Sequence, residues 1–136
     1  MQRIIGRKVL LLLAGTMLFG AGWLAGQQKA ATQKTLIHSA AWTSLKDMKQ
    51  QDFDAFRQVV GGMIGKVPGL KRAWVGKLQK PFVAGALTRD YGIVLEFDDV
   101  NTWNAYVSKR PQEFEDAFAK IRIPDSTNFN VIGNSP

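Results

Sequence analysis

The sequence predicts an α+β fold in which one antiparallel sheet carries its helices on a single face. Apolar side chains alternate with others over residues 91–97, which is typical of a strand with one buried face. Over residues 48–67 and 100–121 they instead recur at three- and four-residue steps, which is typical of amphipathic helices. The elements follow the order strand, helix, strand, strand, helix, strand. This order predicts the ferredoxin-like split βαβ arrangement.

The first strand and helix are expected near the start of this domain. Thr35–Trp42 reads as a strand, and Ser44 and Asp47 have the spacing of a capping box ahead of a helix over Met48–Val67. Its apolar stripe consists of Phe53, Phe56, Val60, Met63 and Val67. Pro68-Gly69 is expected to end the helix and turn the chain.

The next two strands are expected at Leu70–Leu78 and Tyr91–Phe97, and in the latter the odd-numbered residues face one way. Residues 79–89, which contain Pro81 and Gly85, predict a loop between them.

A second helical region and a last strand complete the domain. Asp98 or Asp99 is expected to cap a helix whose apolar stripe is Val100, Trp103, Tyr106 and Val107. Pro111 suits the first turn of a further helical piece that carries Phe114, Ala117, Phe118 and Ile121. Phe129–Ile132 is expected to form the short last strand.

Helices on one face leave the other face of the sheet bare. Apolar side chains on that face would favour contact with a second copy of the chain. The fold therefore predicts a homodimer with a central cavity, or a pocket between sheet and helices.

Residues 1–30 have the pattern of a signal-anchor and precede a domain at residues 31–136. Arg3, Arg7 and Lys8 come before residues 9–26, which carry no charge and would span roughly 27 Å as a helix. This predicts a transmembrane helix with the domain on the non-cytoplasmic side, periplasmic or extracellular in a bacterium. Because the segment shows no clean cleavage site, a retained anchor is favoured; the alternative is secretion after cleavage.

Composition narrows the possible partners and cofactors. Fourteen cations and eleven acids follow residue 30, a balance that does not indicate a nucleic-acid partner. The chain has no cysteine, which excludes disulfides, thiolate metal sites and a cysteine nucleophile. One histidine with scattered carboxylates is not a metal ligand set, so neither a metal nor a cofactor is expected.

Charge is distributed unevenly within the domain. Residues 55–89 contain seven cations and no acid, whereas residues 90–125 contain eight acids and four cations. This pattern fits a solvated surface. It also fits an anionic ligand near Lys71, Arg72 and Lys77, or complementary contact between subunits.

Three segments resemble the stress-responsive dimeric α/β-barrel (Dabb) domain: Ile37-His38, VPGLKRAWVG at Val67–Gly76, and the strand-to-helix block at Tyr91–Phe114. The resemblance covers residues 36–132. It implies a ferredoxin-like protomer and a dimer across the sheets. Most members have no assigned reaction, whereas a plant member is a polyketide cyclase and related barrels include cofactor-free monooxygenases.

The resemblance also implies site residues. His38 matches the histidine near the start of the family's first strand, and Tyr106 matches the tyrosine of its second long helix. The two histidines that often follow that tyrosine in the family are absent here, and Arg110 and Glu113 lie nearby. Trp74, Phe97 and Trp103 are aromatic residues that we expect to line an apolar cavity.

Two functions are compatible with these residues. The first is a membrane-anchored, dimeric stress-response or binding module without catalysis, with an apolar small molecule as a possible ligand. The alternative is a cofactor-independent enzyme acting on an aromatic or polyketide-like compound. His38 would then be the general base and Tyr106 the hydrogen-bond donor. The absent histidines favour the binding module.

Overall fold

The computed structural model describes residues 34–134, which contain four strands and three helices. In chain order these are β1 (Thr35–Ser44), α2 (Gln50–Met63), β2 (Leu70–Ala84), β3 (Leu87–Phe97), α3 (Val100–Ser108), α4 (Gln112–Ala119) and β4 (Arg122–Gly133). The strands form one antiparallel sheet in the order β2-β3-β1-β4. The predicted ferredoxin-like arrangement is confirmed, and β2 and β4 are its edge strands.

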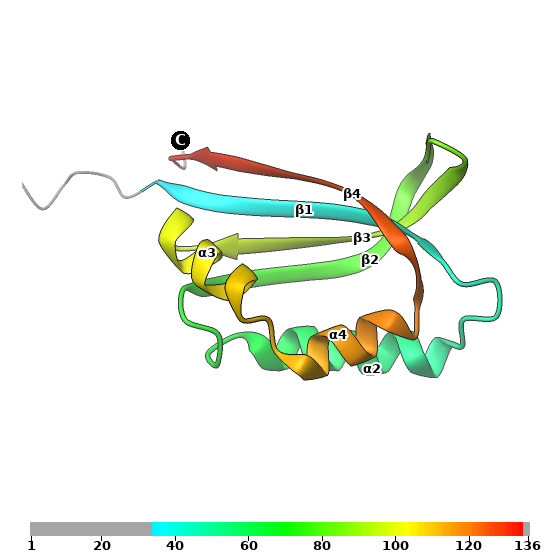
Figure 1. Ribbon diagram of the computed structural model, residues 1–136, viewed down its shortest axis with the longest axis horizontal. Helices are drawn as coiled ribbons and strands as arrows, with labels where there is room; N and C mark the ends of the chain where they lie inside the picture. The colour runs from blue at the N-terminus through cyan, green and yellow to red at the C-terminus, as the bar shows by residue number, and fades with distance from the viewer. Residues whose placement is uncertain (1–33, 135–136) are drawn as a thin grey trace, which may run out of the picture. The chain divides into compact units, whose positions relative to one another are not determined.

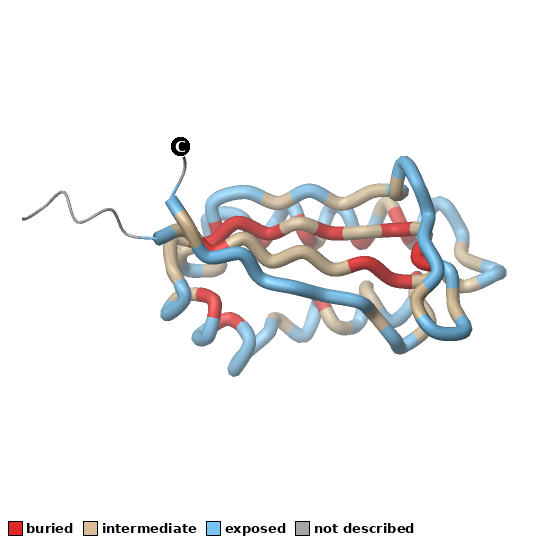
Figure 2. The backbone as a smooth tube through the Cα atoms, turned by 90° about the horizontal axis from the view of Figure 1, so that it is seen from above, coloured by how far each residue is buried: buried red, intermediate tan, exposed pale blue. Residues whose placement is uncertain are grey.

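The three helices cover one face of this sheet and leave the other uncovered (Figure 1). The core lies between the layers. Its sheet side includes the odd-numbered residues Tyr91, Ile93, Leu95 and Phe97, each at most 5% exposed, as their alternation predicts. Its helix side includes Phe53, Phe56, Val60 and Met63 of α2 and Phe114 of α4. Buried residues accordingly concentrate along the two central strands, whereas β4 is mostly exposed (Figure 2).

The predicted loop at residues 79–89 is wrong, because β2 and β3 continue through it as a long hairpin. The hairpin closes at Gly85, whose φ of 64° is followed by a residue without positive φ, the pattern of a type II′ turn. Pro81 lies in β2 where the register with β3 shifts, between Lys77 and Phe82. A proline is tolerated there because β2 is an edge strand and its ladder is already irregular.

The start of α2 also differs from the prediction. Ser44 does not cap the helix, because its Oγ donates to Asp90 Oδ2 at 2.5 Å and its backbone N–H donates to Asp90 Oδ1 at 2.8 Å. The helix begins at Gln50, with Lys49 at the N-cap and no side-chain cap. It ends at Met63, four residues before the predicted Val67.

The beginning of α3 follows the prediction closely. Asp99, one of the two predicted caps, accepts a hydrogen bond from the backbone of Thr102 at 2.8 Å, and the Thr102 side chain accepts from the Asp99 backbone. Pro111 occupies the N-cap of α4 rather than its first turn. The last strand begins at Arg122, seven residues before the predicted start at Phe129.

The ends of the described chain lie side by side, because Thr35 of β1 pairs with Gly133 of β4. The expected anchor at residues 1–30 lies outside the described residues. Within residues 34–134, no helix combines the length and the apolar character needed to cross a bilayer.

Candidate functional site

The sheet has a hollow on each side. On the helix-covered side, a pocket of about 290 Å³ is lined by His38, Trp103, Tyr106, Arg110, Phe114 and Phe118, among others. We call this the aromatic pocket. On the uncovered side, a groove of about 470 Å³ is lined by Trp74, Leu78, Phe82, Gly92, Val94 and Phe129, among others. We call this the bare-face groove.

His38 belongs to the aromatic pocket, where its ring stacks on Trp103 with centroids 4.3 Å apart. Its Nδ1 lies 2.7 Å from Asn130 Oδ1 on β4, the strand residue directly opposite it. An amide oxygen only accepts, so Nδ1 carries the proton and Nε2 keeps its lone pair in the neutral ring. Burial lowers the pKa of His38, the hydrogen bond to Asn130 opposes that shift, and the charge of Arg110 adds to it. At neutral pH His38 is therefore an uncharged base.

Tyr106 reaches the same pocket from α3. Its ring packs against Phe97 at 5.3 Å and Trp103 at 5.7 Å between centroids, and the residue is 4% exposed. Burial raises the pKa of Tyr106 to about 12. The phenol therefore stays protonated at neutral pH and is able to donate a hydrogen bond.

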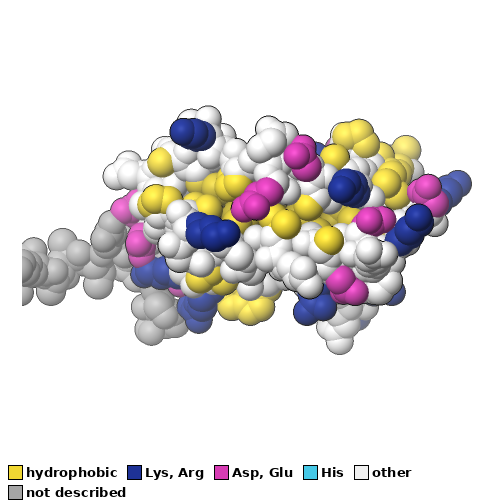
Figure 3. All heavy atoms as spheres, turned by 90° about the horizontal axis from the view of Figure 1, so that it is seen from below, with side chains coloured by type: hydrophobic (Ala, Val, Ile, Leu, Met, Phe, Trp, Pro, Cys, Tyr) yellow, Lys and Arg dark blue, Asp and Glu magenta, His cyan; other side chains and the backbone are white. Residues whose placement is uncertain are grey.

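Arg110 lies between α3 and α4, in the short connection that follows the helix carrying Tyr106. Its guanidinium carbon is 5.9 Å from the centre of the Tyr106 ring, and its Nη1 lies 3.3 Å from Glu115 Oε1. Seen from the helix side, apolar side chains are visible between flanking charged ones (Figure 3). The pocket thus combines an apolar interior with a cation.

The structure also adds pocket residues that the sequence did not indicate. Ser126 and Asn128 line the aromatic pocket, and Asn130 holds His38. All three lie on β4 at even positions. Successive side chains of a strand point to opposite faces, and Phe129 lies on the bare face. Had the strand been predicted at its full length, this alternation would have placed Ser126, Asn128 and Asn130 on the helix side.

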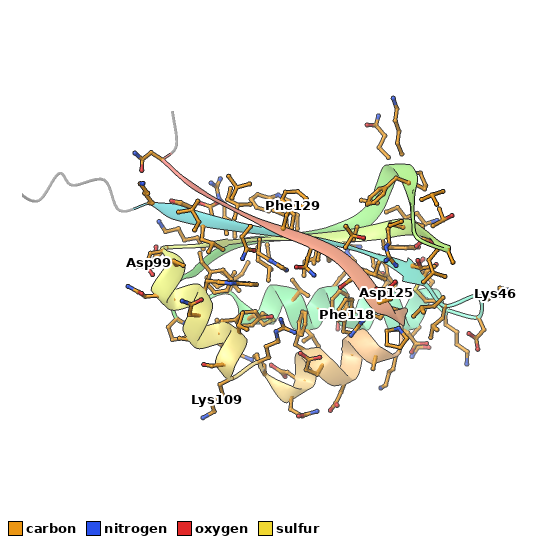
Figure 4. The ribbon with its side chains drawn as sticks, turned by 45° about the horizontal axis from the view of Figure 1, so that its top comes forward. Lys46, Asp99, Lys109, Phe118, Asp125 and Phe129 are labelled. Carbon is orange, nitrogen blue, oxygen red and sulfur yellow. The ribbon has the colours of Figure 1, made fainter. Side chains whose placement is uncertain are left out.

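The three aromatic residues predicted to line one cavity are in different places. Trp74 lies in the bare-face groove and is 50% exposed. Trp103 lies in the aromatic pocket. Phe97 is fully buried beneath Trp103 and Tyr106 and lines neither hollow. Figure 4 shows the same division at β4, where Phe129 and Phe118 lie on opposite sides of the sheet.

The three cations proposed to hold an anion do not converge. Lys71 Nζ is 2.9 Å from Asp98 Oδ1, and Arg72 Nε is 2.6 Å from Glu96 Oε2. Lys77 lies five residues further along β2, with its Nζ 5.9 Å from the centre of the Tyr91 ring. Two of the three cations are thus already paired with carboxylates. Glu96 of β3 pairs with Arg72, and Asp98, just after β3, pairs with Lys71.

Residues 34–134 contain no group of three or more histidine or carboxylate side chains placed to hold a metal ion.

Comparison with known proteins finds likeness in three dimensions only. No family model matches the sequence, and no curated protein matches it. Several solved structures match its fold. A dimeric ferredoxin-like protein of unknown function from Thermobifida fusca is 17% identical, with 73% of this chain and 91% of that chain covered and a TM-score of 0.53.

The fold is that of the dimeric ferredoxin-like proteins. A Dabb family protein from Mesorhizobium loti shares it at 12% identity and a TM-score of 0.56, covering 76% of this chain and all of that one. A hydroxynitrile lyase from Passiflora edulis shares it at 18% identity and a TM-score of 0.57, covering 76% of this chain and 96% of that one. The ferredoxin-like fold that the resemblance implied is thus confirmed, and its neighbours include both an enzyme and proteins of unknown function.

Proposed function

We propose that residues 31–136 form a homodimeric, Dabb-like stress-response module whose aromatic pocket binds an apolar small molecule. The observation that carries the proposal is a pocket walled largely by aromatic and aliphatic side chains, into which a few polar groups are placed: the His38 imidazole and the Tyr106 phenol, both uncharged at neutral pH, with Ser126, Asn128 and Arg110. Pockets of this composition, apolar with a few placed polar groups, are typical small-molecule sites.

The uncovered face of the sheet supports the homodimer. Trp74, Phe129 and Val131 are each at least 50% exposed on it, and contiguous exposed apolar surface of this kind marks an interaction site. The same fold occurs in proteins described as dimeric. Two bare-face grooves brought together would enclose an apolar central cavity.

We also propose that residues 1–30 tether the domain to a membrane, with the domain on the non-cytoplasmic side. The uncharged run at residues 9–26 and the three cations before it support this. Membrane fractionation and N-terminal sequencing of the expressed chain test it. A mature chain that begins beyond Gly26 would contradict retention of the anchor and favour secretion.

Binding is tested on residues 31–136, because the described residues 34–134 belong to one compact unit with its own core. Calorimetric titration with the neutral probe 2-naphthylmethanol should show saturable binding. Trp103→Ala should weaken it by about fivefold or more, because the aromatic wall beside His38 is lost. The matched control is Val83→Ala, since Val83 is 74% exposed and outside the pocket. No binding by the unaltered domain, or equal binding by Trp103→Ala, would contradict the proposal.

One observation favours a second function, a cofactor-independent enzyme. The hydrogen bond from His38 to Asn130 leaves Nε2 free to accept a proton, and Tyr106 lines the same pocket as a donor. Nε2 would take a proton from a carbon next to a carbonyl. The electron pair would move to the carbonyl oxygen, and the resulting enolate would accept the Tyr106 hydrogen bond.

This alternative is tested by comparing turnover of polyketide-like and aromatic ketone substrates by the unaltered domain and by His38→Ala. An enzyme should lose at least about a hundredfold in rate when the base is removed. If both proteins bind the substrates with equal affinity and neither turns them over, the enzyme alternative is rejected and the binding module remains.

A further inference from the structure

We infer, resting on the proposed binding function, that the aromatic pocket takes a planar aromatic anion, a carboxylate or phenolate, whose charge pairs with Arg110. The inference follows from the charge, the shape and the unused hydrogen-bonding capacity of the pocket.

Among the residues that line the aromatic pocket, Arg110 is the one charged side chain, and its carboxylate partner Glu115 lies outside the lining. Arg110 is a full cation, and neither aspartate nor glutamate is among the residues lining this pocket. His38 and Tyr106 are both uncharged at neutral pH, for the reasons given above. An uncharged ligand would leave Arg110 with only its exposed contact to Glu115, whereas an anionic ligand would complement the guanidinium from inside the pocket.

The charge of Arg110 acts inside the pocket as well as at its rim. It lowers the pKa of His38 and opposes the rise in the pKa of Tyr106, although burial is the larger cause for both residues. The guanidinium carbon lies 5.9 Å from the centre of the Tyr106 ring, within the range of a cation–π contact, which agrees with this. An anionic ligand bound among His38, Tyr106 and Arg110 would be attracted by the charge of Arg110. The attraction is stronger in a partly desolvated site than in water.

Arg110 also retains donors for a ligand. Its contact with Glu115 involves one nitrogen, Nη1, and both side chains are about 40% exposed. A guanidinium has five N–H donors in a planar fork, which matches a carboxylate in two-point fashion. The exposed ion pair with Glu115 is worth little, so a better-placed anion would compete with it.

The walls of the pocket favour a flat ligand. The stacked rings of His38 and Trp103 form one wall, and Phe114 and Phe118 contribute further ring surface. A volume of about 290 Å³ lies at the lower end of the range for ligand sites. The pocket therefore fits a small fused-ring body better than a long chain.

The test uses two probes that share a ring system, 2-naphthoate and the neutral 2-naphthylmethanol, titrated into residues 31–136 near neutral pH. The domain should bind the anion about tenfold more tightly. Arg110→Gln should abolish this preference, because it should weaken binding of the anion far more than binding of the alcohol. Arg110→Lys should keep part of it, because the charge remains and the planar fork is lost.

The matched control is Lys77→Gln, which removes a cation that lies outside the aromatic pocket. Its preference for the anion should equal that of the unaltered domain. Equal affinities for the two probes in the unaltered domain would overturn the inference. So would a preference that survives Arg110→Gln or is lost equally in Lys77→Gln.

The results that would overturn the preference for an anion can be told apart from those that would overturn the proposed binding function. If the alcohol binds and Trp103→Ala weakens it while the anion has no advantage, the binding pocket stands and only the ligand class is wrong. If neither probe binds, both proposals are overturned.

Discussion

At the level of single residues, one hydrogen bond determines what His38 can do. Asn130 accepts from Nδ1, which fixes the tautomer, and stacking on Trp103 fixes the plane of the ring. Burial and Arg110 keep the imidazole uncharged. A residue that is both oriented and neutral serves equally as a ligand contact or as a base.

The lowered pKa of His38 predicts how stability depends on pH. The unfolded chain binds a proton near pH 6.5, whereas the folded domain resists it, so the unfolded state holds more protons as the pH falls. We expect the free energy of unfolding to fall from about pH 6.5 downward and to be constant, for this residue, above that value.

Urea unfolding at several pH values measures this effect, with His38→Gln as the comparison. Carboxylates titrate in both proteins, so only the difference between the two curves reports on His38. That difference should widen as the pH falls below about 6.5. Parallel curves would show that the folded domain does not resist protonation of His38.

At the level of elements, the long β2–β3 hairpin shows where reading the sequence fails. Pro81 and Gly85 are ordinary loop signals, and the predicted loop followed from them. In the structure Gly85 forms only the tight turn, and Pro81 lies where β2 runs at the sheet edge with a shifted register. Edge position depends on strand order, which local sequence patterns do not contain.

Contacts between side chains far apart in the chain could not be predicted from the sequence either. Arg89 is 3% exposed and donates to Asp125, Thr127 and Thr43, partners at least 36 residues away. Periodicity predicted the strands, but it could not identify the partners that let a buried arginine join β3 to β1 and β4.

Two glycines allow a matched test of how the elements are joined. Gly69 and Gly85 both have positive φ, but only Gly69 lies against another residue, so a Cβ added there would overlap the Thr102 side chain. Gly85→Ala should lower the free energy of unfolding by about 1 kcal/mol from backbone strain alone. Gly69→Ala should cost more, because it also disturbs the capping box of α3.

Chemical denaturation of the two variants under the same conditions measures this difference. Equal losses would mean that Thr102 moves aside without cost. The helical signal of each folded variant serves as the control for intact secondary structure.

At the level of the whole molecule, the fold is layered on one side only. The sequence predicted this from element order, and it placed His38 and Tyr106 in a common site through the Dabb resemblance. It could not show that His38 faces the helices and not the proposed dimer interior. The structure shows that His38 shares its side of β1 with Leu36 and Trp42, which are buried under the helices, and the register of β1 against β4 sets Asn130 opposite His38.

If the uncovered face forms the dimer interface, a charge introduced there should weaken the dimer. Phe129→Asp places a carboxylate in the bare-face groove and should convert residues 31–136 from dimer to monomer at about 10 µM, because burying an unpaired charge is costly. Ile64→Asp is the control, since Ile64 is 45% exposed just after α2 and outside the groove. Sedimentation velocity gives the mass of each. A monomeric unaltered domain would exclude the proposed dimer.

The pairing of Thr35 with Gly133 means that the described chain enters and leaves at the same corner, while the exposed Lys46 turn lies at the far end (Figure 4). A circular permutant that joins residue 134 to residue 34 by a short glycine linker and opens between Lys46 and Asp47 should therefore keep every strand pairing. Its circular dichroism spectrum should match that of the parent domain. Such a molecule would have both of its free ends at the opposite pole, so a surface attachment could be moved from one end of the sheet to the other without altering the pocket.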